Sequence, residues 1–292
     1  MNPFDFSGPE FLLFYIGLSV LVIIAIGILR RKSESGPTPR IDLSDPLLIA
    51  FLRGGHSEAM RVATISLIDR GLLRCTGTRL QAAAQARPES VRRPIEKALL
   101  QKFHTSDEAA SMFDDPKLKS TLDQYEESLT KVRLLPDASI RETRTLLFAG
   151  AFLMLGGVGV SKLIVALDRG RPNVCFLIVL IVVAIVIASK QAFPRLTESG
   201  KAMLQDVKNL YSELRDRAAL LNPGGATIEP MMLAAVFGVG ALAGSGFAYT
   251  KKLFPRAKQS STTSSCGSSC GGGCGSSCGG GGCGGGCGGC GS

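Results

Sequence analysis

The 292-residue sequence has no tryptophan and only two histidines, and neither histidine lies in a catalytic pattern. His56 and His104 lack the spacing of a metalloprotease helix or of a nucleophile triad. The glycine-rich residues 156–162 lack the glycine that directly precedes the lysine of a phosphate-binding loop, and they lie inside an apolar run. No pair of carboxylates has an acid/base pattern around it. We therefore predict that the protein is not an enzyme.

Cysteine is scarce in the body of the chain, where only Cys75 and Cys175 occur. So few thiols exclude a disulfide framework there. The remaining cysteines lie in a tail of glycine and serine with hardly any apolar side chain, and we expect this tail to be disordered unless something crosslinks it. These tail cysteines are Cys266, Cys270, Cys274, Cys278, Cys283, Cys287 and Cys290.

The tail cysteines are the candidate metal ligands of the chain. Soft thiolates at short spacing suit Zn²⁺ or Cu(I), and glycine lets the backbone wrap around an ion. Their spacing is mostly three intervening residues, whereas a structural zinc site uses pairs separated by two. A flexible tail without a ligand, and disulfide or modification chemistry, are the alternatives that this spacing leaves open.

The sequence is rich in apolar residues, at 45% hydrophobic against 20% charged, and these gather in long runs. Residues 11–29, 146–167 and 174–188 are each close to the length that crosses a bilayer as a helix. The short turn 168–173 joins the last two, which predicts a helical hairpin in the membrane. Near the outer end of the second run, Lys162 is expected to extend its long side chain toward the membrane interface.

A fourth run, 231–249, is interrupted by glycines and is harder to place. Its strongly apolar residues supply about −2 to −4 kcal/mol of insertion free energy, against about −4 to −7 kcal/mol for the third run. Gly240 and Gly244 form a pair of small residues suited to close packing against a membrane helix. We expect three spans plus a membrane-associated segment, and a fourth span is the alternative.

Basic residues dominate the polar flanks of the predicted spans, and the net charge is +9. Residues 30–32 are all basic and follow the first run, while Arg141, Arg144, Lys190 and Arg195 flank the hairpin. The positive-inside rule therefore places the polar modules in the cytosol. We predict a multi-pass membrane protein whose main partner is the lipid bilayer, with other membrane proteins as further candidate partners.

The polar module after the first run begins with a helix, another helix and a hairpin. Asp45 and Pro46 supply the start of the first helix, and Gly54 and Gly55 stop it. Ser57 is expected to cap the second helix. The hairpin is expected in residues 72–80 with its turn at 76–77. This order is found in winged-helix domains.

Two apolar stripes predict two amphipathic helices after the β-hairpin. A third helix is expected after the transmembrane hairpin, with Thr197 as its cap. The stripes are Ile95, Leu99 and Phe103, followed by Leu118, Leu122, Tyr125, Leu129 and Val132.

Arginines cluster around the winged-helix-like part, at positions 53, 61, 70, 74 and 79. Such a cluster would suit phosphate contacts to DNA, which gives the alternative of a membrane-tethered regulator. It suits a module held against anionic lipid equally well. We favour a non-enzymatic scaffold or envelope protein whose tail binds metal or partners, and we do not expect nucleic acid to be a partner.

The predicted fold class is a mainly α membrane protein with about three transmembrane helices. The segments are 1–32, an N-terminal transmembrane anchor; 33–144, a cytosolic helical, winged-helix-like module; 145–190, a transmembrane hairpin; 191–229, an amphipathic helical segment; 230–250, an apolar glycine-rich segment that is membrane-associated or spanning; and 251–292, a disordered Gly/Ser/Cys-rich tail.

Short motifs carry a resemblance to a known family. They are residues 50–55 (AFLRGG), 67–73 (LIDRGLL), 169–172 (RGRP) and 194–200 (PRLTESG). In these the chain resembles a family of uncharacterised bacterial membrane proteins that share an N-terminal anchor, an LRGG helix end and an RGRP turn, and often a Gly/Cys-rich end. The resemblance covers nearly the whole chain and implies a location in a bacterial cell membrane. It carries no established activity, so it transfers no catalytic residue.

Overall fold

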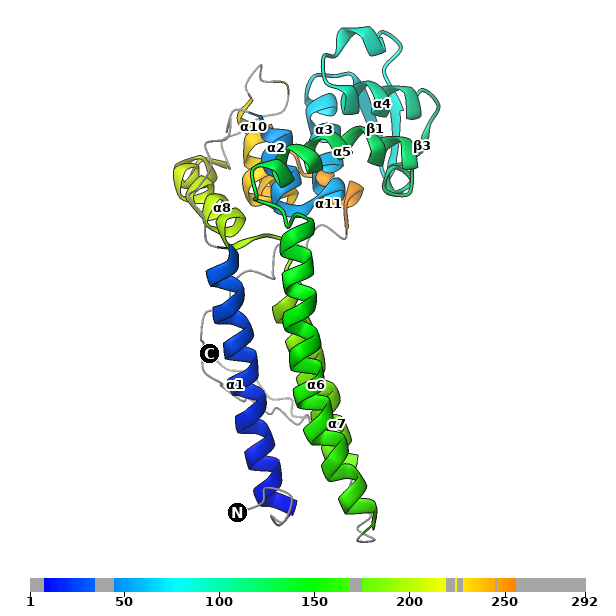
Figure 1. The fold of residues 1–292 in the computed structure, drawn as a ribbon. Helices are drawn as coiled ribbons and strands as arrows, with labels where there is room; N and C mark the ends of the chain where they lie inside the picture. Colours follow the sequence, from blue (N-terminus) through cyan, green and yellow to red (C-terminus); the bar gives the residue numbers. More distant parts are fainter. Residues whose placement is uncertain are drawn as a thin grey trace, which may run out of the picture.

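The computed structural model describes residues 8–34, 45–168, 175–218, 224, 228–244 and 246–255. They form a bundle of long helices with a head of shorter helices at one end (Figure 1). Helices α1 (Gly8–Glu34), α6 (Ala138–Asp168) and α7 (Cys175–Ala192) make the bundle. Of the described residues, only these three helices are long and apolar enough to cross a membrane. The mainly α fold with three spans is confirmed.

The bundle is apolar on both its inner and outer faces. Leu13 and Leu153 are each 72% exposed, and Phe176 is 61% exposed, as expected for side chains that face lipid. Between the helices, the hydroxyl of Tyr15 donates a hydrogen bond to the Leu155 carbonyl at 3.0 Å. A polar side chain inside the bilayer needs such a partner because no water is available there.

Lys162 packs inside the bundle. Its side chain is buried, and its Nζ lies 4.8 Å from the centroid of the Phe11 ring on α1. Phe11 lies in the first turns of α1, and its aromatic face offers the cation a partner between the helices. The expected extension of Lys162 toward the membrane interface stays a prediction. Residues 156–162 are helical within α6, which agrees with rejecting a phosphate-binding loop.

The first half of the head follows α1. Asp45 caps α2 by accepting a hydrogen bond from the Leu47 backbone N–H, and Gly55 ends that helix at φ 72°. The strands form one antiparallel sheet in the order β1-β2-β3. The predicted order of helix, helix and hairpin is therefore confirmed. The elements are α2 (Pro46–Gly54), α3 (His56–Asp69), β1 (Leu73–Thr76), β2 (Arg79–Ala82), η2 (Pro88–Ser90), α4 (Pro94–Lys102), β3 (Asp107–Glu108), η3 (Ala109–Phe113) and α5 (Pro116–Lys131).

Two local details differ from the expectation. Helix α3 begins at His56 with Gly55 as its N-cap, so Ser57 lies inside the helix instead of capping it. In the hairpin, Thr76 pairs with Arg79, which moves the turn one residue along from the expected 76–77. The turn then places Gly77 at φ 66°, a conformation that glycine adopts without steric penalty.

The second half of the head follows the transmembrane hairpin. The Thr197 hydroxyl accepts a hydrogen bond from the Gly200 N–H, which confirms the predicted cap. Helix α10 lies beside α2 (Figure 1), and residues from both halves of the head share one hydrophobic core. The transmembrane hairpin of α6 and α7 is thus inserted between two halves of one packed unit. The elements are α8 (Glu198–Leu210), α9 (Ser212–Asp216), α10 (Glu229–Phe237), η5 (Val239–Gly244) and α11 (Tyr249–Leu253).

The described apolar residues of the fourth run pack into this core, and none of the described helices in it is long enough to span a membrane. Leu233 and Val236 of α10 have no exposed surface. The helix has 9 residues and ends at Gly238, whose φ is 99°. At 1.5 Å per residue it is about 14 Å long, half of what a span requires. A Cβ atom at Gly240 would meet no other described atom within 4 Å, so no described helix packs closely there.

Candidate functional site at the base of the head

A buried ion pair joins the bundle to the head. Arg144 of α6 donates from Nε to Glu34 Oε1 of α1 at 2.7 Å, and these side chains are only 3% and 1% exposed. The other guanidinium nitrogens of Arg144 donate to the carbonyls of Pro194 at 2.5 Å and Leu196 at 3.3 Å. One side chain therefore binds both α1 and the segment between α7 and α8.

A second pair lies beside the first. Arg30 of α1 contacts Glu198 of α8 at 2.5 Å, and the backbone N–H of Glu198 donates to Glu34 Oε2 at 3.1 Å. Burial alone would raise the pKa of Glu198, but the hydrogen bond and charge of Lys201 and the charge of Arg30 outweigh it and hold the pKa below its usual value. We call Arg30, Glu34, Arg144 and Glu198 the junction clasp.

A further buried charge group holds the helices of the head together. Glu58 of α3 accepts hydrogen bonds from Arg53 and Arg61, and Arg53 also donates to the Ala234 carbonyl of α10 at 3.2 Å. Burial lowers the pKa of Arg53, and the carboxylate of Glu58 opposes that shift. Removing one member would leave a buried charge without its partner, which costs about 3–5 kcal/mol.

Three of the five arginines that suggested DNA contacts pair with carboxylates of the head, and two of these three are mostly buried. Arg53 and Arg61 pair with Glu58 and are 13% and 11% exposed, and Arg70 pairs with Glu96 at 3.0 Å. Arg74 and Arg79 remain on the exposed face of the hairpin. The surface therefore keeps Arg74 and Arg79 together with Arg70, which is 44% exposed, and loses Arg53 and Arg61 to the core.

A cavity of about 340 Å³ opens at the base of the head, where α6 begins. Arg195 forms one wall and donates to the Phe51 carbonyl at 2.6 Å and to the Leu52 carbonyl at 3.0 Å, so it caps the last turn of α2. Burial lowers the pKa of Arg195, while the charge of Glu126 opposes that shift. We call this the basal cavity; it is lined by Phe51, Gly55, His56, Glu126, Leu135, Pro136, Arg141 and Arg195.

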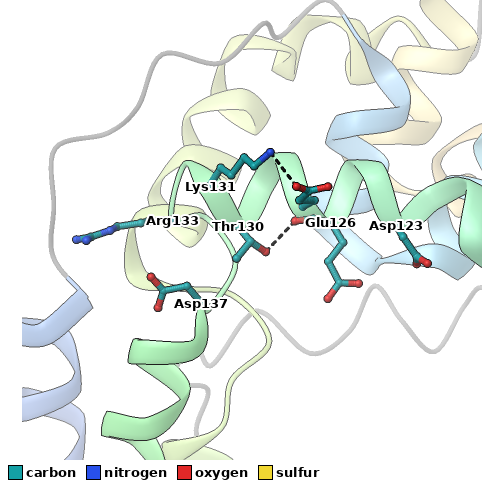
Figure 2. A pocket seen from close by; sticks show the side chains of 7 residues that line it. Asp123, Glu126, Thr130, Lys131, Arg133 and Asp137 are labelled. Carbon is teal, nitrogen blue, oxygen red and sulfur yellow. Dashed lines mark hydrogen bonds and ion pairs between the residues drawn. The ribbon is translucent and has the colours of Figure 1, made fainter.

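A shallower hollow of about 760 Å³ continues along α5 (Figure 2). Figure 2 shows Asp123 and Glu126 extending from the same side of the helix, while Lys131 reaches in another direction. Lys131 pairs with Glu127 at 2.8 Å, and both of these side chains are exposed. Glu126 lines both hollows, so it lies between them.

His56 meets two carboxylates where the hollows join. Its Nε2 lies 3.2 Å from Asp123 Oδ1. One nitrogen or oxygen atom each of His56, Asp123 and Glu126 lies within 4.8 Å of the other two. The sequence offered no partner for His56 and no sign of this group, because its members come from helices far apart in the chain and leave no local spacing signal.

The tail cysteines, from Cys266 to Cys290, lie outside the described residues. The two cysteines elsewhere in the chain are free thiols, and burial raises the pKa of Cys75. Metal binding by the tail therefore stays a prediction.

A family model described as the C-terminal domain of a predicted membrane protein, DUF2207, matches residues 44–243. The match begins beside α2 and ends in η5, so it covers both halves of the head and the hairpin between them. No curated protein and no solved structure matches the chain. The predicted membership in a membrane-protein family is confirmed, and the chain belongs to the DUF2207 family of predicted membrane proteins.

Proposed function

We propose that this protein is a non-enzymatic scaffold or envelope protein that holds a helical binding module at a fixed orientation beside the bilayer. Its glycine- and cysteine-rich tail recruits metal or partner proteins. The observation that carries the proposal is the junction clasp. A buried ion pair often adds little net stability over apolar packing, whereas it is well suited to select one arrangement of the helices.

The clasp supports this role because it joins three chain segments at a single place. Glu34 accepts hydrogen bonds from Arg144 and from the backbone of Glu198. These contacts come from α1, α6 and the start of α8. The head is therefore fixed to the bundle by directional contacts, which a flexible tether would not need. A platform of stable orientation is what a scaffold requires.

The basic flanks support a cytosolic head in a bacterial cell membrane. Arg30, Arg31 and Lys32 lie in the last turns of α1, at the end of the bundle that carries the head (Figure 1). Lys190 lies in the last turn of α7 at the same end. Positive charge at this end is the pattern of a cytoplasmic face. The DNA-binding alternative loses support because Arg53 and Arg61 are buried in pairs with Glu58, and the exposed Arg70 already pairs with Glu96.

Photo-crosslinking in living cells tests the scaffold. A photoreactive amino acid is placed at exposed head positions 79 or 119 of the full chain, in the wild type and in Arg144→Leu. We expect discrete crosslinked partners in the wild type and a changed set in Arg144→Leu at equal membrane abundance. Lys131→Met, which breaks an exposed pair, is the control and leaves the set unchanged. Identical partner sets in wild type and Arg144→Leu would contradict a role that depends on orientation.

A further inference from the structure

Three side chains with nitrogen or oxygen donors converge at the base of the head. His56 is the first residue of α3, and Asp123 and Glu126 lie about one turn apart on α5. Residues three positions apart on a helix project from the same face, and Figure 2 shows both carboxylates extending from the same side of α5. One oxygen atom of each lies within 4.8 Å of a nitrogen atom of His56. A group drawn from two helices, with an imidazole among the carboxylates, differs from an ordinary acidic patch on one helix surface.

As a group, the donor atoms of the three side chains are spaced slightly more widely than they would be around a bound metal ion. Bonds of about 2.0–2.2 Å in a tetrahedral shell place neighbouring donor atoms roughly 3.3–3.6 Å apart. The separation between His56 Nε2 and Asp123 Oδ1 is 3.2 Å, and the third donor lies within 4.8 Å. The side chains of Asp123 and Glu126 are 65% and 41% exposed, so they can rotate to close the remaining gap.

The surroundings fix the histidine and leave room for water. The His56 ring packs edge-on against Phe51, with ring centroids 4.9 Å apart. The basal cavity opens beside His56 and Glu126, where water molecules can complete a coordination shell. Arg141 Nη2 lies 3.7 Å from Glu126 and would compete with a cation. Its side chain is 64% exposed, so it can turn into solvent when a cation binds.

We propose that His56, Asp123 and Glu126 bind one divalent cation of the Mn²⁺ or Zn²⁺ type. One imidazole with two carboxylates and water suits these ions, whereas Ca²⁺ and Mg²⁺ prefer shells of oxygen only. The site differs from the thiolates of the tail, which suit softer ions. A bound cation ties the start of α3 to α5 near the point where α6 leaves the head.

Mn²⁺ titration of the full chain tests the site. The protein is placed in nanodiscs of neutral phosphatidylcholine, and free Mn²⁺ is followed by its electron paramagnetic resonance signal. Mn²⁺ is a hard ion with little affinity for thiolates, so the tail does not compete. We expect one Mn²⁺ per chain, displaced by excess Zn²⁺. Asp123→Asn and His56→Gln weaken binding by about tenfold or more, as expected for the loss of a direct ligand.

The matched control is Glu127→Gln. It also removes a carboxylate from α5, but one that is 67% exposed and paired with Lys131. We expect it to change Mn²⁺ affinity less than twofold. Unchanged binding in Asp123→Asn, equal weakening in Glu127→Gln, or no loss of the free signal at millimolar Mn²⁺ would overturn the proposal. Circular dichroism confirms that each variant keeps its helices, which the exposed positions of Asp123 and Glu127 favour.

Discussion

Helices α7 and α10 are both almost wholly apolar, yet they face opposite surroundings. Helix α7 has 18 residues, and its Phe176 and Val179 are 61% and 59% exposed on the outside of the bundle. Helix α10 has 9 residues, and its Leu233 and Val236 are fully buried in the head. Apolar composition shows that each helix avoids water. Length, and the presence of a matching apolar face, decide whether lipid or protein covers it.

The same contrast separates the two parts of the molecule. In the bundle, lipid would cover the apolar surfaces of the helices if the helices separated. Apolar packing between these helices therefore adds little stability over contact with lipid. In the head, apolar side chains would be exposed to water if the helices separated. Each buried apolar side chain there stabilises the fold by about 1.5–3 kcal/mol relative to the exposed side chain. We therefore expect changes in the core of the head to have larger effects than matched changes on the lipid face.

The largest expected effect is the loss of one half of the head. A fragment of residues 41–135 lacks α10, so the apolar faces of α2 and α3 that α10 covers would be open to water. We expect this fragment to show no cooperative thermal transition by circular dichroism. A fusion of residues 45–135 to residues 196–255 should restore a cooperative transition. The Thr197 N–H donates to the Leu134 carbonyl at 3.2 Å, so the end of the first segment already lies beside the start of the second. Cooperative unfolding of the 41–135 fragment would contradict a core shared by both halves.

The second prediction compares single residues of α10 and α7. Leu233→Ala leaves a cavity in the packed core and should lower the free energy of unfolding by about 2–5 kcal/mol. Val179→Ala on the lipid face should change it by about 0.5 kcal/mol, because lipid fills the space. Thermal unfolding of both variants in nanodiscs measures the difference. Equal shifts in the two midpoints would show that α10 is not a core element.

A third prediction uses glycines. A Cβ atom at Gly200 of α8 would lie 2.4 Å from the Leu134 carbonyl oxygen, where α8 passes close to the end of the first half of the head. Gly200→Ala should therefore destabilise the head by about 1–3 kcal/mol. A Cβ atom at Gly150 in the bundle would meet no atom within 4 Å. Gly150→Ala should be neutral, or stabilising by up to about 1 kcal/mol, because alanine favours helix. The same unfolding assay separates the two, and destabilisation by Gly150→Ala would contradict an open lipid face there.

Features that depend on local sequence were predicted well. The three spans follow from run length, and α4 and α5 follow from stripes such as Ile95, Leu99 and Phe103, all of which are fully buried. The cap at Thr197 follows from residue type. In each case the physical signal lies within a few turns of chain, so a single sequence contains it.

Features that depend on distant contacts were missed. The run 231–249 was judged on its insertion free energy, which does not include the apolar faces of α2 and α3 that receive α10. Arg144 was interpreted as a cytosolic flank charge, whereas it is the buried partner of Glu34. His56 had no visible partner, because Asp123 and Glu126 reach it only through the packing of α5. No spacing within one sequence reports these pairings.

The smallest expected effect concerns pH at the junction clasp. The pKa of Glu198 is lowered in the folded protein, because Lys201 and Arg30 together outweigh the effect of burial. A lowered folded pKa stabilises the protein above the unfolded value of about 4.3, and that contribution is lost as the pH falls through the folded pKa. Glu127, whose pKa is also lowered by Lys131, is fully exposed, so solvent screens its contribution. The unfolding midpoint should therefore fall less steeply below about pH 4.3 in Glu198→Gln than in Glu127→Gln. Equal slopes in the two variants would show that the clasp charges act like surface charges.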